Sequence, residues 1–117
     1  MIEKDAFITQ NLTEKYKVTV DGRTFFCVNT VRPDYRSEMG NQLAALSKDN
    51  GMEATGGIIY EVDDKTAIGY GTHFKISLRS IGDVDTTSMS EKYGGGGHKN
   101  ASSFMLPIGE WNALIIN

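Results

Sequence analysis

Four consecutive glycines followed directly by His98 constrain the fold of this chain more than any other feature. Each glycine in an ordered element costs roughly 0.5–1 kcal/mol relative to alanine, because it loses more backbone freedom on folding. A folded chain keeps such a run where the backbone approaches something closely or repeatedly adopts positive φ. The run Gly94-Gly95-Gly96-Gly97 therefore predicts either a wall of backbone N–H groups that faces an anion, or a flexible linker or helix stop.

The composition is that of one ordinary folded domain. The chain has 117 residues, of which 39% are hydrophobic and 23% charged, so we expect a single compact domain over 1–117. Twelve Lys and Arg against 15 Asp and Glu give a net charge of −3, which argues against duplex binding through a broad basic face. The single cysteine suits a reducing compartment, and no apolar run approaches the roughly 20 residues of a membrane span. We expect a cytoplasmic protein with no membrane partner.

The spacing of apolar residues predicts an α/β fold, in which a mixed β-sheet has helices packed on it. Strand-like alternation on both sides of Asp21-Gly22 indicates a two-residue hairpin. Apolar residues at helical spacing indicate a helix between two groups of strands. The predicted strands are 16–20, 23–28, 55–62, 74–80 and 101–106, the predicted helices are 37–47 and 86–93, and 108–116 is a short helix or strand.

Two polar groups follow the glycine run directly. Lys99 can neutralise a phosphate, and His98 can donate a hydrogen bond to a phosphoryl oxygen. A flexible linker is not usually followed by His-Lys-Asn-Ala-Ser and a strand. These neighbours favour an anion-binding role for the run.

Arg79 is the second candidate for phosphate binding. On strand 74–80 it shares a face with Ser77, opposite the apolar Ile76 and Leu78. If the apolar face packs on the core, the guanidinium is left to fork two hydrogen bonds to a phosphate. The alternative is a surface ion pair with a carboxylate such as Asp85, worth only about 0–1 kcal/mol.

The order of these motifs resembles the C-terminal half of the DHH phosphoesterases. That family shows a Ser-Leu-Arg-Ser strand, an Asp before a short helix, and Gly-Gly-Gly-Gly-His-x-x-Ala-Ala-Gly-Phe. Residues 77–80, Asp85 and 94–104 match this pattern, and 37–44 resemble the family's helix beside the sheet. The resemblance covers about 16–106, with Ser102-Ser103 in place of the Ala-Gly pair.

The resemblance implies the substrate-binding, DHH-associated domain of a two-domain hydrolase. The family's N-terminal domain carries the Asp-His-His motif and two divalent metals, usually manganese, whereas this chain has no Asp-His-His. We therefore expect no catalytic residue, metal ligand or cofactor here, and no turnover by this chain alone, with His98 assisting at the interface with that N-terminal domain. The substrate-binding residues implied are Ser77, Arg79, Gly94, Gly95, Gly96, Gly97, His98, Lys99 and Asn100.

The implied ligand is a nucleotide phosphate or a short oligonucleotide. Members of the family hydrolyse short RNA, single-stranded DNA, cyclic dinucleotides, pAp or polyphosphate. We expect Arg79 and His98 to face one pocket, with the N–H groups of Gly94 to Gly97 as its floor. The alternative is a stand-alone single-stranded nucleic-acid or tRNA-binding module without catalysis, akin to the glycine-rich domain that ends alanyl-tRNA synthetases. That domain usually lacks the histidine after the glycines.

Other polar and aromatic residues are interpreted as structural. Asp85 is expected to cap the helix that follows it, and Cys27 to be a buried, inert thiol within an apolar run. Tyr93 and Phe104 flank the glycine run and are expected to anchor it in the core. His73 is expected to be a structural histidine near a strand edge.

Overall fold

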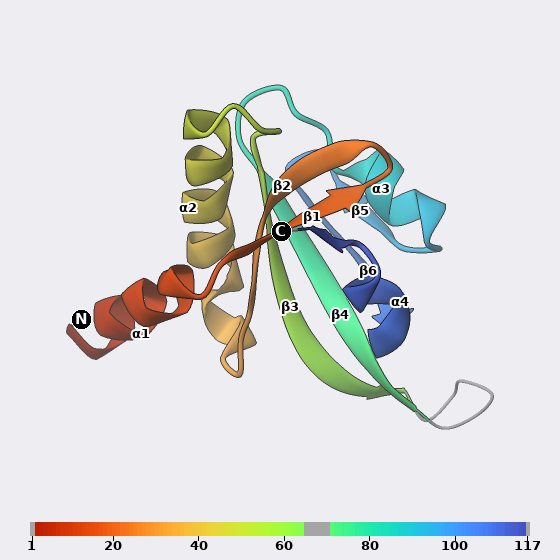
Figure 1. Ribbon diagram of the computed structural model, residues 1–117, viewed down its shortest axis with the longest axis horizontal. Helices are drawn as coiled ribbons and strands as arrows, with labels where there is room; N and C mark the ends of the chain where they lie inside the picture. The colour runs from red at the N-terminus through yellow and green to blue at the C-terminus, as the bar shows by residue number, and fades with distance from the viewer. Residues whose placement is uncertain (1, 65–70, 117) are drawn as a thin grey trace.

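The computed structural model describes residues 2–64 and 71–116, which form one mixed β-sheet with helices on both faces (Figure 1). This confirms the predicted α/β fold. In chain order the elements are α1 (Ile2–Thr13), β1 (Tyr16–Val20), β2 (Arg23–Asn29), the 3-10 helix η1 (Pro33–Tyr35), α2 (Arg36–Asp49), β3 (Thr55–Asp64), β4 (Gly71–Ser80), α3 (Thr87–Lys92), β5 (Gly96–His98), β6 (Ala101–Pro107), α4 (Ile108–Asn112) and β7 (Ile115–Ile116).

The described strands follow the order β5-β6-β4-β3-β2-β1-β7 across the sheet. Neighbouring strands are antiparallel except β2 and β3, which are parallel and are joined through α2. The hairpin between β1 and β2 turns at Asp21 and Gly22, with φ of 52° and 76°. Positive φ at both residues matches the right-handed twist of the flanking strands, so the predicted hairpin is confirmed.

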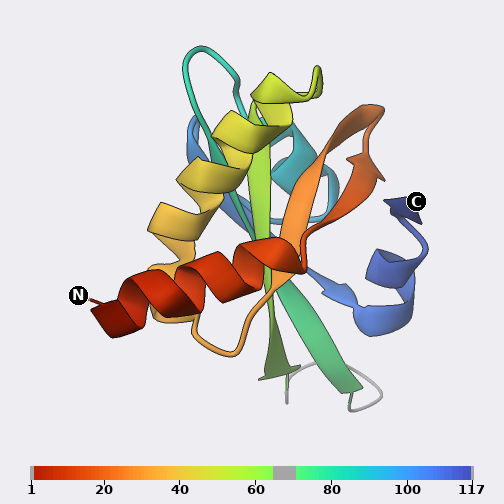
Figure 2. The same ribbon diagram turned by 60° about the vertical axis from the view of Figure 1, so that its left-hand side comes forward.

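The two faces of the sheet carry separate apolar clusters. On one face, Phe26 and Ile58 pack against Met39 and Leu43 of α2, and α1 lies beside them (Figure 2). The opposite face carries the larger cluster, which includes Trp111 of α4 and is bordered by α3. Because alternate residues of a strand point to opposite faces, every second residue of a central strand joins the same cluster.

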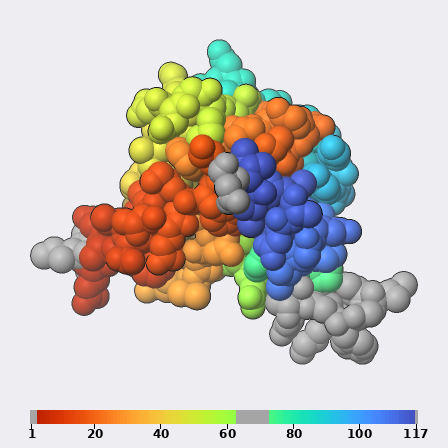
Figure 3. Space-filling view, viewed as in Figure 1, coloured from red at the N-terminus to blue at the C-terminus, as the bar shows by residue number. Residues whose placement is uncertain are grey.

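Two elements differ from the sequence-based expectation. Helix α1 was not expected, because its apolar residues do not line up along one face of the helix. Among its described residues, Ile8 is the one buried apolar side chain. The helix projects from one side of the molecule (Figure 3). Residues Gly96–His98, expected to form a loop, are an edge strand, since pairing with β6 overrides the poor strand propensity of glycine.

The C-terminal segment contains both alternatives that the sequence left open, a short helix (α4) followed by a short strand (β7). No helix among the described residues is long and apolar enough to cross a membrane.

Candidate phosphate-binding site

The pairing register brings Arg79 and His98 to the same face of the sheet. Arg79 of β4 lies opposite Ala101 of β6, and Ala101 lies opposite His98 of β5. Residues directly opposite one another on adjacent strands project to the same side. Two strand spacings separate the Cα atoms of Arg79 and His98 by about 10 Å. Arg79 and His98 can therefore contact the same ligand, as the predicted shared site requires.

The next row across the same strands consists of small residues. Ser77, Ser103 and Gly96 lie opposite one another on β4, β6 and β5. Together with the first row they form the surface called here the open face: Ser77, Arg79, Gly96, His98, Ala101 and Ser103. Small side chains keep the middle of this surface low, and none of the six residues is acidic.

The burial of alternate residues along β6 shows that one face of this strand is covered and the other is accessible. Ser102, Phe104 and Leu106 are buried on the side of α3 and α4, whereas the alternate residues remain partly or fully exposed. Helix α2 packs chiefly on β3, with smaller contacts to β4 and β2. Ser77 is 3% exposed and lies at the covered margin of the open face, next to β3.

Arg79 is held against the start of α2. A Cβ atom placed on Gly40 would lie 2.5 Å from Cγ of Arg79, so the absence of a side chain at Gly40 makes room for the arginine stem. One guanidinium nitrogen, Nη2, donates to the hydroxyl of Ser37 at 3.2 Å. Within residues 2–64 and 71–116, Arg79 forms no ion pair, so the alternative pairing with Asp85 is wrong.

The electrostatic surroundings of Arg79 favour an anion. Partial burial lowers the pKa of Arg79, and the nearby charge of Arg36 lowers it further. The guanidinium nevertheless stays charged at neutral pH, because its ordinary pKa lies above 12. A partly desolvated cation beside a second cation is stabilised by a bound anion.

The first half of the glycine run ends α3. The N–H of Gly94 donates to the carbonyl of Glu91 at 3.0 Å, and the N–H of Gly95 donates to that of Ser90 at 2.8 Å. Gly94 adopts φ of 82°, the left-handed conformation that commonly follows a helix. The predicted floor of free N–H groups is therefore wrong for Gly94 and Gly95, because the last carbonyls of α3 accept from them.

From Gly95 to Gly97 the backbone of the run packs closely against the backbone of β6. A Cβ atom on Gly95 would lie 2.0 Å from the carbonyl oxygen of Ser103, and one on Gly97 would lie 2.6 Å from that of Ala101. Gly96, between them, has open space where a side chain would be. The run thus serves as a helix stop and as a close backbone contact at once.

Lys99 and Asn100 form the turn between β5 and β6 and engage the loop after β4. Lys99 pairs with Asp83 at 3.3 Å. The amide of Asn100 donates to Ser80 Oγ at 2.8 Å and to the carbonyls of Gly82 and Val84 at 3.3 Å. These contacts hold the loop in place, and a direct role of the two residues in ligand binding stays a prediction.

Ser102, which departs from the motif that the sequence resembles, belongs to a buried group of hydroxyls. Ser102 Oγ lies 2.7 Å from Thr86 Oγ1 and 2.6 Å from Ser90 Oγ. These bonds attach α3 to β6, the strand on which the glycine run lies. Ser102 therefore supports the site from the opposite face of the sheet.

Several structural assignments made from the sequence are confirmed. Asp85 accepts hydrogen bonds from the hydroxyl of Thr87 and, at 2.8 Å, from its N–H at the start of α3, and both bonds lower the pKa of the Asp85 carboxyl. Tyr93 stacks on Phe104, with ring centroids 4.9 Å apart. His73 lies within β4, opposite Val62 and Pro107, and its structural role stays a prediction.

Cys27 is fully buried, and burial raises the pKa of its thiol. Because the thiolate is the reactive form, we expect Cys27 to react with a thiol reagent at pH 8 roughly a thousandfold more slowly in the folded protein than in denaturant. With a thiol reagent that releases a chromophore when it reacts, absorbance measures both reaction rates. Equal rates would show that the thiol is accessible, against the buried position.

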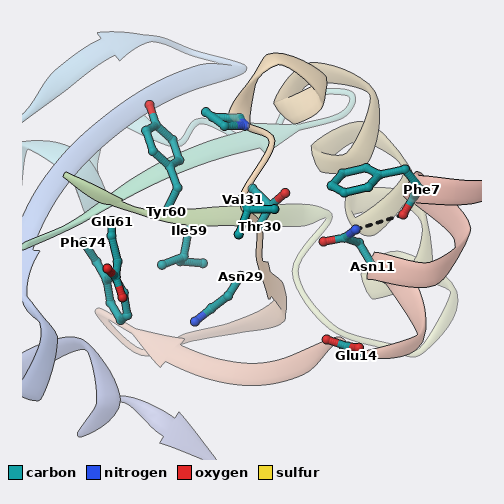
Figure 4. A pocket seen from close by; sticks show the side chains of 11 residues that line it. Phe7, Asn11, Glu14, Asn29, Thr30, Val31, Ile59, Tyr60, Glu61 and Phe74 are labelled. Atoms are coloured by element: carbon teal, nitrogen blue, oxygen red, sulfur yellow. Dashed lines mark hydrogen bonds between the residues drawn. The ribbon is translucent and has the colours of Figure 1, made fainter. Parts of the chain in front are cut away.

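A cavity of about 620 Å³ lies between α1 and β3 (Figure 4). Phe7 and Asn11 of α1, with Glu14 of the turn that follows it, line one side, and Tyr60 and Glu61 of β3 line the other. Sequence reasoning missed this cavity because it did not predict α1. None of the six open-face residues lines it.

Within residues 2–64 and 71–116, no three His, Cys, Asp or Glu side chains are grouped so that they could hold a metal ion. No family model matches the chain, and a search of curated proteins finds no significant match.

Proposed function

We propose that this chain is the substrate-binding domain of a DHH-type phosphoesterase, and that its open face holds a phosphate of a nucleotide or short oligonucleotide. The observation that carries the proposal is the row Arg79–Ala101–His98 across three strands. It places the arginine of the Ser-Leu-Arg-Ser strand and the histidine after the glycines on one uncovered surface. The motif resemblance supplies the substrate class.

Each part of the open face has a role in this proposal. Arg79 forks two hydrogen bonds to a phosphate, because one of its nitrogens contacts Ser37 and the others remain available. His98, exposed on the edge strand, donates to a second phosphoryl oxygen. Ala101, Ser103 and Gly96 let a ligand approach the sheet between these two residues.

The catalytic half belongs to a partner in this proposal. An N-terminal DHH domain would supply the divalent metals, with manganese as the expected ion, which activate water and stabilise the leaving oxygen. This chain binds and orients the phosphate, and His98 reaches toward the interface from the sheet edge. We place the enzyme in the cytoplasm, in keeping with the single reduced cysteine.

Calorimetric titration with a 5′-phosphorylated dinucleotide tests the proposal, with the unphosphorylated nucleoside as the control. We expect saturable heat with the dinucleotide only. Amide NMR shifts should concentrate at Gly96, His98 and Ala101, and should be small at Glu14, which lines the cavity. Absence of binding, or shifts confined to the cavity, would contradict the assignment.

Two further outcomes would distinguish the proposed function from catalysis by this chain alone and from binding of nucleic acid without catalysis. Manganese-dependent release of mononucleotides by the pure chain would contradict the placement of the metals in a partner domain. Much tighter binding of long single-stranded RNA or tRNA than of the dinucleotide would favour the non-catalytic nucleic-acid module instead.

A further inference from the structure

Arg36 is a second arginine beside the open face, and no motif in the sequence indicated a binding role for it. Arg36 is the first residue of α2, directly before Ser37, whose hydroxyl accepts from Arg79. The stem of Arg79 packs against Gly40, which lies one helical turn after Arg36 on the same face of α2. The charge of Arg36 also lowers the pKa of Arg79. Two guanidinium groups from different elements, β4 and α2, therefore share one local environment.

The acidic groups nearest to this pair in the sequence are already engaged. Asp34 is held by Arg32, with Nη2 and Oδ2 3.1 Å apart, and Glu38 is paired with Lys4. Arg36 uses Nη1 to donate to the carbonyl of Pro33 at 2.8 Å. In the part of the chain that the structure describes, neither Arg36 nor Arg79 forms an ion pair with a carboxylate.

Two arginines from adjoining elements, neither paired with a carboxylate among the described residues, suit a ligand that carries two negative charges on one group. A terminal phosphate monoester carries about −1.5 to −2 charges at pH 7, whereas an internal phosphodiester carries about −1. Each guanidinium presents a planar fork of donors that matches phosphate oxygens. A single internal phosphate would leave one of the two cations without a full partner.

We propose that Arg36 and Arg79 together form a subsite for a terminal phosphate monoester. The inference rests on the proposed function and adds to it that the site selects the phosphorylated end of its ligand. Ser37 orients Arg79 within the subsite, and Pro33 orients Arg36. Arg36 is the residue that distinguishes a terminal phosphate from an internal one.

Paired calorimetric titrations test this subsite, with one dinucleotide carrying a 5′-phosphate and the same dinucleotide without it. We expect the unaltered chain to bind the phosphorylated form at least tenfold more tightly. Arg36→Gln should weaken binding of the phosphorylated form at least fivefold and of the other form less than twofold. Arg36→Lys keeps the charge and loses the fork, so it should retain part of the preference.

Lys48→Gln is the matched control, because Lys48 is an exposed cation at the opposite end of the same helix, α2. It should leave the preference unchanged. Thermal unfolding followed by circular dichroism shows that each variant is folded before titration. Binding that depends on Arg79 but ignores the 5′-phosphate would overturn the subsite and leave the proposed function standing. Failure of the unaltered chain to bind either dinucleotide would overturn both.

Discussion

Gly95→Ala is expected to destabilise the domain by roughly 3 kcal/mol, because overpacking of a close contact costs about 1–3 kcal/mol and this contact is a severe one. The added Cβ would lie 2.0 Å from the carbonyl oxygen of Ser103 and 2.8 Å from Cα of Phe104. Both are backbone atoms of a paired strand, so neither can turn aside as the end of a flexible side chain would. Urea unfolding followed by far-UV circular dichroism measures the loss.

Gly96→Ala is the matched control from the same run. A Cβ atom there meets nothing within 4 Å, so we expect a change of about 0.5 kcal/mol or less, as for other surface substitutions. Equal losses for the two variants would show that the glycines are needed for a common reason, such as chain flexibility. A small loss for Gly95→Ala would contradict the close approach to β6.

The conformation of the glycine run could be predicted from the sequence only in part. Four costly residues predict a close approach or positive φ, and the structure contains both, at Gly95 and at Gly94. The sequence did not say which N–H groups stay free. That depends on where α3 ends, and the ends of helices are set by tertiary contacts as much as by local preference.

Elements with clear periodicity were predicted well. The hairpin, α2 and the strands of the sheet were expected close to their observed bounds, since apolar spacing and turn residues agree there. Helix α1 and β5 were missed for one physical reason. Each is held by contacts distant in sequence, α1 by packing beside α2 and β5 by pairing with β6, and neither has a strong local signal.

The candidate site was predicted in part. Alternation along strand 74–80 placed Arg79 on the face opposite Leu78, and the structure agrees. The shared row with His98 depends on the register between β4, β6 and β5, which no local pattern contains. Arg36 was missed because its role arises from the packing of α2 against Arg79.

Arg79→Ala is expected to weaken binding of a 5′-phosphorylated dinucleotide by roughly 1.5–3 kcal/mol, the value of a hydrogen-bonding group that carries a charge. The substitution also removes the stem that packs against Gly40 and the hydrogen bond to Ser37, so thermal unfolding first shows that the variant is folded. Calorimetry on the folded chain measures the change. His98→Ala should weaken binding less, since His98 stands on the exposed edge strand, and should lower turnover strongly once the catalytic domain is present.

Lys92→Ala serves as the control for Arg79→Ala. It removes a positive charge from the last turn of α3, but that charge is exposed and already paired with Asp21. Surface pairs of this kind contribute about 0–1 kcal/mol, so we expect a small change in affinity. If both variants lose affinity equally, the ligand senses general positive charge and not a built arginine site. If Arg79→Ala binds as tightly as the unaltered chain, the open face is not the phosphate-binding surface, because every other contact proposed for the ligand is arranged around that guanidinium.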